Sequence, residues 1–198
     1  MTHPLVETHP LPPFLPPHAR LLMLGSFPPP RARWKMDFYY PNLQNDMWRI
    51  FGVVFFNDAD HFLLSNKKGF AETKLRDFLW QKGIAISDTA QSVIRLQNNA
   101  ADKYLQIQEE VDLAALLRAL PHCETLLTTG EKATATLLRL TQATLPIPAV
   151  GAQLSWRFEN RDLHLFRLPS SSRAYPLALA KKAAIYRQFF KDIGLLTH

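Results

Sequence analysis

The chain lacks the residues that several common kinds of site require. Its 198 residues include a single cysteine, so no intrachain disulfide can form and a cysteine-based zinc site is excluded. The seven histidines show no HxH or i, i+4 spacing, and we therefore expect no metal site. The cysteine, Cys123, precedes the apolar pair Leu126 and Leu127, which favours a buried structural thiol over a catalytic nucleophile.

The short motifs that hold nucleotide cofactors are also absent. No GxGxxG follows an apolar stretch and no GxxxxGK[ST] occurs, so the dinucleotide-binding and P-loop classes lose the loops that cradle phosphate. The GxSxG elbow of α/β-hydrolases is missing as well. We therefore expect a protein that works without a cofactor.

Long apolar runs are missing too. No stretch approaches the roughly 18 apolar residues that a membrane-spanning helix needs. The N-terminus has no basic region followed by an apolar one, as a secretory signal would. We expect a cytoplasmic protein without a membrane partner. Positive charge, in contrast, is in excess: the formal net charge of +6 and a pI near 9.6 favour a polyanionic partner.

Proline is concentrated at the N-terminus, where six of the 15 prolines lie within the first 17 residues. Proline fixes φ and removes an amide donor, which disfavours both a helix and the interior of a sheet. We predict an extended arm over residues 1–18, packed along a single domain that spans residues 19–198. The alternative is a polyproline segment that binds a partner.

Apolar strands and amphipathic helices alternate along the rest of the chain. Strands are predicted at 21–24, 83–89, 124–130 and 163–170, and helices from about 45, over 69–82, 111–120 and 131–140, and from 175 to about 193. Residues 53–56 fit a strand or the continuing helix, residues 91–105 read as a polar loop, and residues 154–158 as a possible short strand. The alternation predicts an α/β fold, a three-layer α/β/α sandwich with a central, mainly parallel four-stranded sheet.

An unusual cluster, FYYPNLQND, follows the first strand. Phe38, Tyr39 and Tyr40 offer flat faces on which a nucleobase can stack for about 1–3 kcal/mol. The amides that follow can donate and accept hydrogen bonds together, as the edge of a base requires. The plainer interpretation is that these rings cap the core.

A second cluster, LPSSSRAYP, follows the last predicted strand. Three consecutive hydroxyls, Ser170, Ser171 and Ser172, stand before the predicted final helix, whose free amides and dipole favour a phosphate. Arg173 adds a cation. The alternative is an ordinary helix cap made by one serine.

Together the two segments resemble the two motifs of the uracil-DNA glycosylase superfamily. LGSFP at 24–28 and YYPNLQNDMW at 39–48 resemble the first motif of the mismatch-specific uracil and hypoxanthine branch, and LPSSSRAY at 168–175 resembles its second motif, LPS[ST]SPA[NY]. GIAISDT and TTGEKA lie between them where that branch carries strand-end segments. The resemblance extends from about Leu21 to Phe190.

The resemblance implies a monomeric enzyme that binds DNA and hydrolyses the N-glycosidic bond of a flipped, deaminated base, with uracil and hypoxanthine as leading substrates. It implies a base stacked on Tyr39 or Tyr40, phosphates held by the serines, and Arg173 in the gap that the flipped nucleotide leaves. The expected base-binding set is Gly25, Ser26, Phe27, Phe38, Tyr39, Tyr40, Asp88 and Thr129, with Asp88 either contacting the base or bracing the loop. Arg31, Arg33 and Lys35 are expected to bind flanking phosphates, unless they form a solvated loop.

The catalytic position departs from the family pattern. Uracil-specific families place Asp or Asn shortly after the first glycine, whereas Ser26 and Phe27 stand there in this chain. The hypoxanthine branch retains an asparagine that aligns with Asn45, which we expect to position water. Asp37 and Asp46 are the competing candidates, although Asp46 also suits the first turn of a helix. The alternatives are a DNA-binding module without catalysis and an enzyme that acts on small nucleosides.

Overall fold

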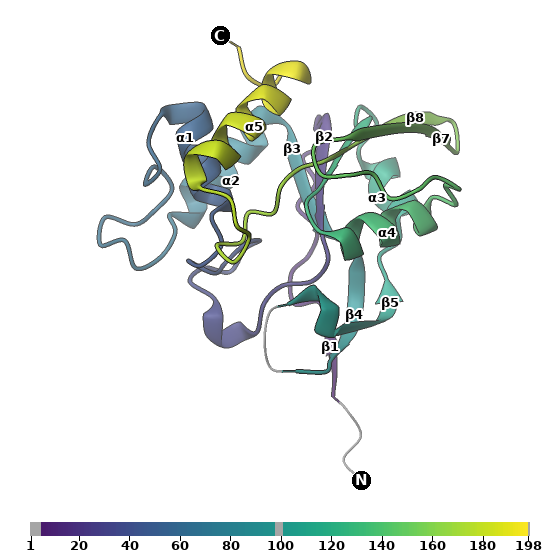
Figure 1. Ribbon diagram of the computed structural model, residues 1–198, viewed down its shortest axis with the longest axis horizontal. Coiled ribbons are helices and arrows are strands. Elements are labelled where there is room, and N and C mark those ends of the chain that lie inside the picture. The colour runs from purple at the N-terminus through teal and green to yellow at the C-terminus, as the bar shows by residue number, and fades with distance from the viewer. Residues whose placement is uncertain (1–4, 98–100, 198) are drawn as a thin grey trace.

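The computed structural model describes residues 5–97 and 101–197, and its centre is a five-stranded sheet in the order β3-β2-β6-β8-β7 (Figure 1). The four predicted strands are its parallel members: β2 (Leu21–Gly25), β3 (Ile84–Asp88), β6 (Thr125–Thr128) and β8 (Arg161–Arg167). The fifth strand, β7 (Gln153–Phe158), pairs antiparallel with β8 at one edge. The prediction of a mainly parallel sheet is confirmed, and the sheet has one strand more than the four expected.

Helices cover both faces of this sheet, as the apolar strands require. On one face lie α1 (Met47–Phe56), α2 (Glu72–Lys82) and α5 (Leu179–Asp192), and on the other α3 (Leu113–Ala119) and α4 (Glu131–Leu140) (Figure 1). Successive residues of β2 alternate between the two cores: Leu21 and Met23 pack under the first group, Leu22 and Leu24 under the second. The three-layer prediction is therefore confirmed.

Two local ambiguities are resolved by the helices. Residues 53–56 continue α1 rather than forming a strand. Gly83 ends α2, as predicted, with φ +67°, a left-handed conformation that glycine adopts without the penalty of a Cβ. The final helix begins at Leu179 rather than at Tyr175. Pro176 explains part of this delay, since the residue before a proline is steered away from helical angles.

The predicted polar loop at 91–105 was the main error in the fold. Its described part forms most of β4 (Ala90–Arg95), the 3-10 turn η2 (Asp102–Tyr104) and the start of β5 (Leu105–Glu110). These strands join β1 (Val6–Thr8) in a small antiparallel sheet, β1-β4-β5. Val93, fully buried, and Leu105 hold it against Phe27. The alternation of apolar and polar residues in these strands is short, and the many polar residues around it made the segment resemble a loop.

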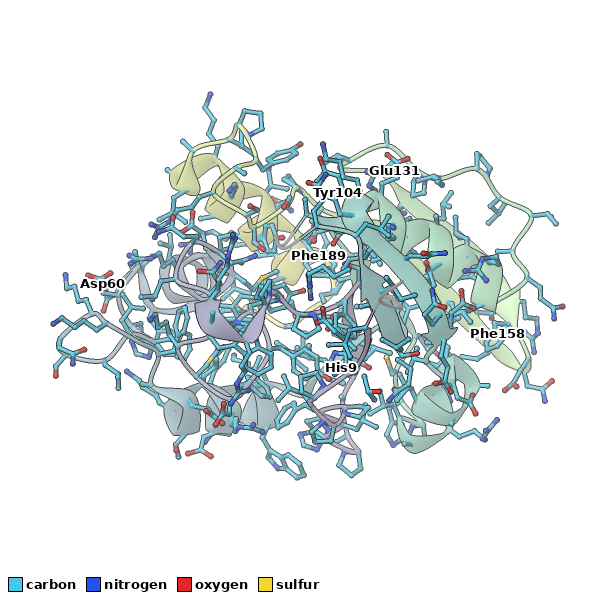
Figure 2. All side chains as sticks on the ribbon, turned by 90° about the horizontal axis from the view of Figure 1, so that it is seen from below. His9, Asp60, Tyr104, Glu131, Phe158 and Phe189 are labelled. Atoms are coloured by element: carbon cyan, nitrogen blue, oxygen red, sulfur yellow. The ribbon has the colours of Figure 1, made fainter. Side chains whose placement is uncertain are left out.

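The N-terminal arm runs along strand edges. β1 supplies the outer strand of the small sheet, and beyond it Phe14 pairs with Ile86 on the open edge of β3 through two backbone hydrogen bonds of 2.9 Å. An edge position suits a segment in which prolines remove amide donors. His9 of this arm lies beside the strands of the small sheet (Figure 2). In the described part of the chain, no helix combines the length and the apolar character needed to span a bilayer.

Candidate active site

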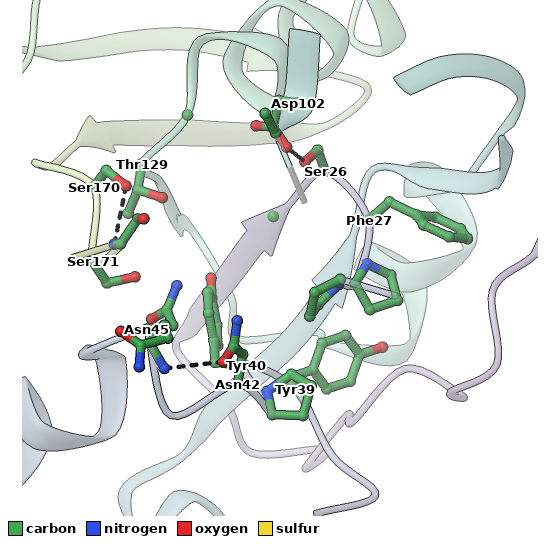
Figure 3. A pocket seen from close by; sticks show the side chains of 18 of the residues that line it. Ser26, Phe27, Tyr39, Tyr40, Asn42, Asn45, Asp102, Thr129, Ser170 and Ser171 are labelled. Atoms are coloured by element: carbon green, nitrogen blue, oxygen red, sulfur yellow. Dashed lines mark hydrogen bonds between the residues drawn. The ribbon is translucent and has the colours of Figure 1, made fainter. Parts of the chain in front are cut away.

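The carboxyl ends of the four parallel strands meet around a cavity of about 500 Å³ (Figure 3). Gly25 ends β2, Asp88 ends β3, Thr129 follows β6 and Ser170 lies beyond β8, and all four line the cavity. This is the edge at which open α/β sheets bind ligands, because the loops that leave it converge there. The fold therefore places both sequence clusters around one hollow.

Most of the predicted site residues line this cavity. They are Gly25, Ser26, Phe27, Arg33, Tyr39, Tyr40, Asn45, Asp88, Thr129, Ser170, Ser171, Ser172 and Arg173. Five others do not line it: Arg31, Lys35, Asp37, Phe38 and Asp46. Asp102 lines it too, although sequence reasoning assigned that residue to a polar loop.

The aromatic cluster divides into core and cavity rings. Phe38 is 1% exposed and stacks on Trp48, so it belongs to the core. Tyr39 is also buried and donates its hydroxyl to the carbonyl of Pro12 in the N-terminal arm. Tyr40 has φ +51°, a strained left-handed conformation for a bulky residue, and its ring borders the cavity (Figure 3). Tyr40 is therefore better placed than Tyr39 to stack on a ligand.

Burial disfavours ionisation of both tyrosine hydroxyls. The pKa values of Tyr39 and Tyr40 are raised well above 10, chiefly because burial disfavours the phenolate and further because the Asp88 carboxylate lies nearby. Neither phenol is thus available as an anionic base near neutral pH. The rings offer apolar faces and hydroxyl groups only.

Backbone contacts hold the two motif segments together. The Asp46 amide donates to the Ser171 carbonyl at 2.8 Å, and the Arg173 amide donates to the Gln44 carbonyl at 3.1 Å. The Arg173 guanidinium also donates to the Asp46 carboxylate at 2.8 Å. The fully buried Lys182 of α5 donates a hydrogen bond from its ammonium group to the Ser172 carbonyl at 2.7 Å. Asp46 thus braces this junction and lies outside the cavity lining.

The serine loop is not the helix N-terminus that the sequence suggested. Because α5 begins only at Leu179, its dipole and free amides do not reach the serines. The Ser170 hydroxyl accepts the Ser172 amide at 3.2 Å, and the Ser172 hydroxyl accepts the Ala174 amide at 3.2 Å. The hydroxyls shape a turn at the cavity wall, which corrects the predicted phosphate site on a helix end.

Asn45 caps the helix that the motif leads into. Its Oδ1 accepts the Met47 amide at 2.9 Å, at the first residue of α1. Asp46 occupies the N-cap position but makes no side-chain cap there, contrary to the expected first-turn role. The Met47 amide occupies one lone pair of Oδ1, so the NH₂ donor and the second lone pair of the oxygen remain for a ligand.

The basic loop forms an ordered turn at the cavity mouth. The Arg31 guanidinium pairs with Asp37 and lies 4.3 Å from the centre of the Trp34 ring, within η1 (Arg31–Arg33) and its flank. Both members of this ion pair are more than 60% exposed, so it contributes little to stability. Asp37 is therefore a surface partner of the loop, and Arg33 is its cation at the cavity.

Asp88 is held by a residue from the N-terminal arm. His9 Nε2 lies 2.7 Å from Asp88 Oδ2, with the two side chains 5% and 10% exposed. His9 Nδ1 lies 3.0 Å from the Leu11 carbonyl and 3.2 Å from the Leu11 amide, so the backbone can partner this nitrogen in either protonation state. No local pattern identifies His9, because 79 residues separate it from its partner.

Asp102 stands against the residue that follows the first motif glycine. Its Oδ1 accepts the Ser26 hydroxyl at 2.5 Å (Figure 3). Burial raises the pKa of Asp102 above its usual range, and the negative charge of Asp88 adds to the rise, whereas the Ser26 hydrogen bond and Lys132 oppose it. Among the residues described, no three His, Cys, Asp or Glu side chains are grouped to hold a metal ion.

The sheet order and the cavity at its carboxyl edge define an α/β fold with a ligand site at the strand ends. No protein-family model and no curated protein sequence matches the chain. Among solved structures, the chain is similar to the solution NMR structure of a "putative Uracil DNA glycosylase" from Methanosarcina acetivorans, with 20% identity and a TM-score of 0.59 over 93% of this chain and 98% of that one. The likeness shows that the two chains share a fold.

Gly25 tests how tightly the cavity floor is packed. A Cβ added at this glycine would lie 2.5 Å from Asp88 Oδ1 and 3.8 Å from the Tyr40 hydroxyl. We expect Gly25→Ala to push Asp88 away from His9 and to lower the free energy of unfolding by about 1–3 kcal/mol. Denaturant unfolding measures this change. An unchanged free energy of unfolding would show that Asp88 moves aside freely.

Proposed function

We propose that the protein is a DNA glycosylase of the uracil-DNA glycosylase superfamily that hydrolyses the N-glycosidic bond of a flipped uracil or hypoxanthine. The observation that carries the proposal is the cavity at the sheet edge, which residues of both motif-like segments line. Its volume of about 500 Å³ lies in the range of small-molecule sites. The fold shared with the NMR structure described as a "putative Uracil DNA glycosylase" supports it.

The lining suits a nucleobase. Tyr40 offers an aromatic face, the Asn45 amide offers a donor to a base carbonyl, and the carboxylate of Asp88 offers an acceptor to a ring N–H. The oxo bases uracil and hypoxanthine carry a carbonyl and an N–H side by side. Donors near the departing base would also stabilise the negative charge that develops when the bond breaks.

The surroundings suit a strand of DNA. Arg33 and Arg173 line the cavity, both residues are exposed, and the chain carries a net charge of +6. Flanking phosphates would pair with such cations, and flipping one base costs a few kcal/mol, least at a mismatched or damaged pair. Since one chain supplies the whole cavity, we expect a monomer to be the active unit.

A panel of defined oligonucleotides tests the proposal. We expect the purified protein to leave abasic sites in strands that carry uracil or hypoxanthine, measured as alkali-labile breaks, and to leave undamaged strands intact. Activity should fall as salt rises, because counterion release opposes binding. Salt-sensitive binding without breaks would instead indicate a DNA-binding module, and cleavage of free deoxynucleosides with little salt dependence would indicate a nucleoside hydrolase.

A further inference from the structure

The proposed reaction needs a group that accepts a proton from water, and the candidates from the sequence are each engaged elsewhere. Asp37 pairs with Arg31 outside the cavity lining. Asp46 pairs with Arg173 and also lies outside it. Asn45 uses its Oδ1 to accept the Met47 amide, and an amide is in any case a weak base. The carboxylates that line the cavity are Asp88 and Asp102.

Asp88 is the more constrained of these two carboxylates. Its Oδ2 is bound by His9 at 2.7 Å. Its Oδ1 lies against Gly25, only 2.5 Å from where a Cβ would stand. These contacts fix Asp88 at the floor of the cavity, where it can accept a hydrogen bond from a bound base. Asp102 is then the carboxylate that remains to accept a proton from the attacking water.

Asp102 brings a carboxylate to the place where the sequence lacks one. Ser26 directly follows the glycine after which uracil-specific glycosylases carry Asp or Asn, and its hydroxyl donates to Asp102 Oδ1 at 2.5 Å. Asp102 Oδ2 reaches toward Gly130, at 3.0 Å from the position of an added Cβ, so a larger residue at Gly130 would crowd the carboxylate. The turn η2 thus places the Asp102 carboxylate beside the first motif, which has no carboxylate at this position.

We propose that Asp102 is the catalytic carboxylate of this protein and takes the proton from the water that attacks C1′ of the flipped nucleotide. The hydroxyl of Ser26 holds the Asp102 carboxylate in place. This inference rests on the proposed function. The water oxygen forms a bond to C1′, the C1′–N bond breaks, and its electron pair leaves with the base. The water proton passes to Asp102 and then, through solvent, to the departed base, so atoms and charge balance. General base catalysis of this kind contributes about 10²–10⁴-fold.

The environment of Asp102 makes the reaction dependent on pH. The nearest charged groups include Asp88, which ends β3 and pairs with His9 of the N-terminal arm. On α4 they are Glu131, Lys132 and Arg139, and Lys103 is adjacent in the chain. Burial and Asp88 raise the pKa of Asp102. The ionised form is the base, so the rate should increase with pH and the inflection should lie above the range of an ordinary aspartate.

The test is single-turnover cleavage of a uracil- or hypoxanthine-containing duplex by Asp102→Asn. We expect the rate constant to fall about 100- to 1,000-fold and to lose its acidic inflection, while affinity for the same DNA stays within about threefold. Because the pKa of Asp102 is raised on folding, its ionised form opposes folding at neutral pH, and Asp102→Asn should melt at or above the wild-type temperature. A folded, binding but slow variant is the expected result.

Two further variants sharpen the test. The exchange Ser26→Asp with Asp102→Ser keeps one carboxylate and one hydroxyl in the pair but places the carboxylate at the family position, and we expect at least tenfold recovery over Asp102→Asn. Asp162→Asn is the matched control. The Asp162 side chain is 66% exposed and lies at the end of β8 away from the cavity, so this variant should cleave like the wild type.

Each outcome has one meaning. If the wild type cleaves and Asp102→Asn cleaves within threefold of it, the role of Asp102 is refuted while the proposed function stands. If the wild type leaves every substrate of the panel intact, both fall. Loss of DNA affinity in Asp102→Asn equal to its loss of rate would also refute a proton-transfer role.

Discussion

Replacing His9 by alanine should lower the free energy of unfolding by about 3–5 kcal/mol, as expected when one member of a buried pair is removed. Asp88 would be left almost without solvent, since its side chain is 10% exposed and its Oδ2 loses the nitrogen at 2.7 Å. The imidazole also fills space, with its ring 5.2 Å from that of Phe27 and 5.9 Å from that of Tyr39. The effect on cleavage should be large as well, because displacement of a group by about 1 Å can cost about 100-fold.

The conservative variant His9→Gln separates packing from hydrogen bonding. Its amide NH₂ can still donate to Asp88, so we expect less than half of the loss in unfolding free energy that alanine causes. Chemical denaturation and single-turnover cleavage measure the two effects. If His9→Ala unfolds like the wild type and cleaves at the same rate, the arm contributes nothing to the site, contrary to the contact with Asp88.

The parts of the fold that follow local patterns could be predicted from the sequence. Leu21–Leu24 is a run of four apolar residues ended by glycine, and it forms the buried β2. The small sheet could not be recognised in the same way. Its strands mix buried and exposed positions over only a few residues, and β1 joins the sheet by pairing with a segment more than 80 residues away, as Glu7 does with Val93.

The same distinction applies to the site. The tyrosines, Asn45 and the serines belong to two contiguous segments, so their residue types alone indicated a shared role. His9 contacts the cavity residue Asp88 across 79 residues, and Asp102, which lines the cavity, contacts Ser26 across 76 residues. Nothing near His9 or Asp102 in the chain signals those partners. Asp46 was misread for a related reason, since a carboxylate at a helix start usually serves the helix, whereas this one pairs with Arg173 across 127 residues.

Asn45 can be tested with two substitutions that remove different parts of its amide. Asn45→Asp keeps an oxygen that accepts the Met47 amide, whereas Asn45→Ala removes this cap and should cost about 0.5–2 kcal/mol of stability. If the NH₂ donates to the carbonyl of the departing base, both variants should lose about 10²–10³-fold in single-turnover rate, the cost of removing one such donor. Aspartate should be at least as slow as alanine, because it would place a negative charge where negative charge develops.

The aspartate variant distinguishes the two roles that an asparagine can have here. If Asn45 instead positions water through its oxygen, a carboxylate would do this as well or better, and Asn45→Asp would retain or exceed the wild-type rate. Such a result would show that residue 45 can accept the proton of the attacking water. It would contradict the proposal that Asp102 activates water and Asn45 binds the base. The double variant Asn45→Asp with Asp102→Asn compares the two roles directly. If the roles are separate, the two losses in rate multiply. Restored cleavage would show that a carboxylate at either position can act as the general base.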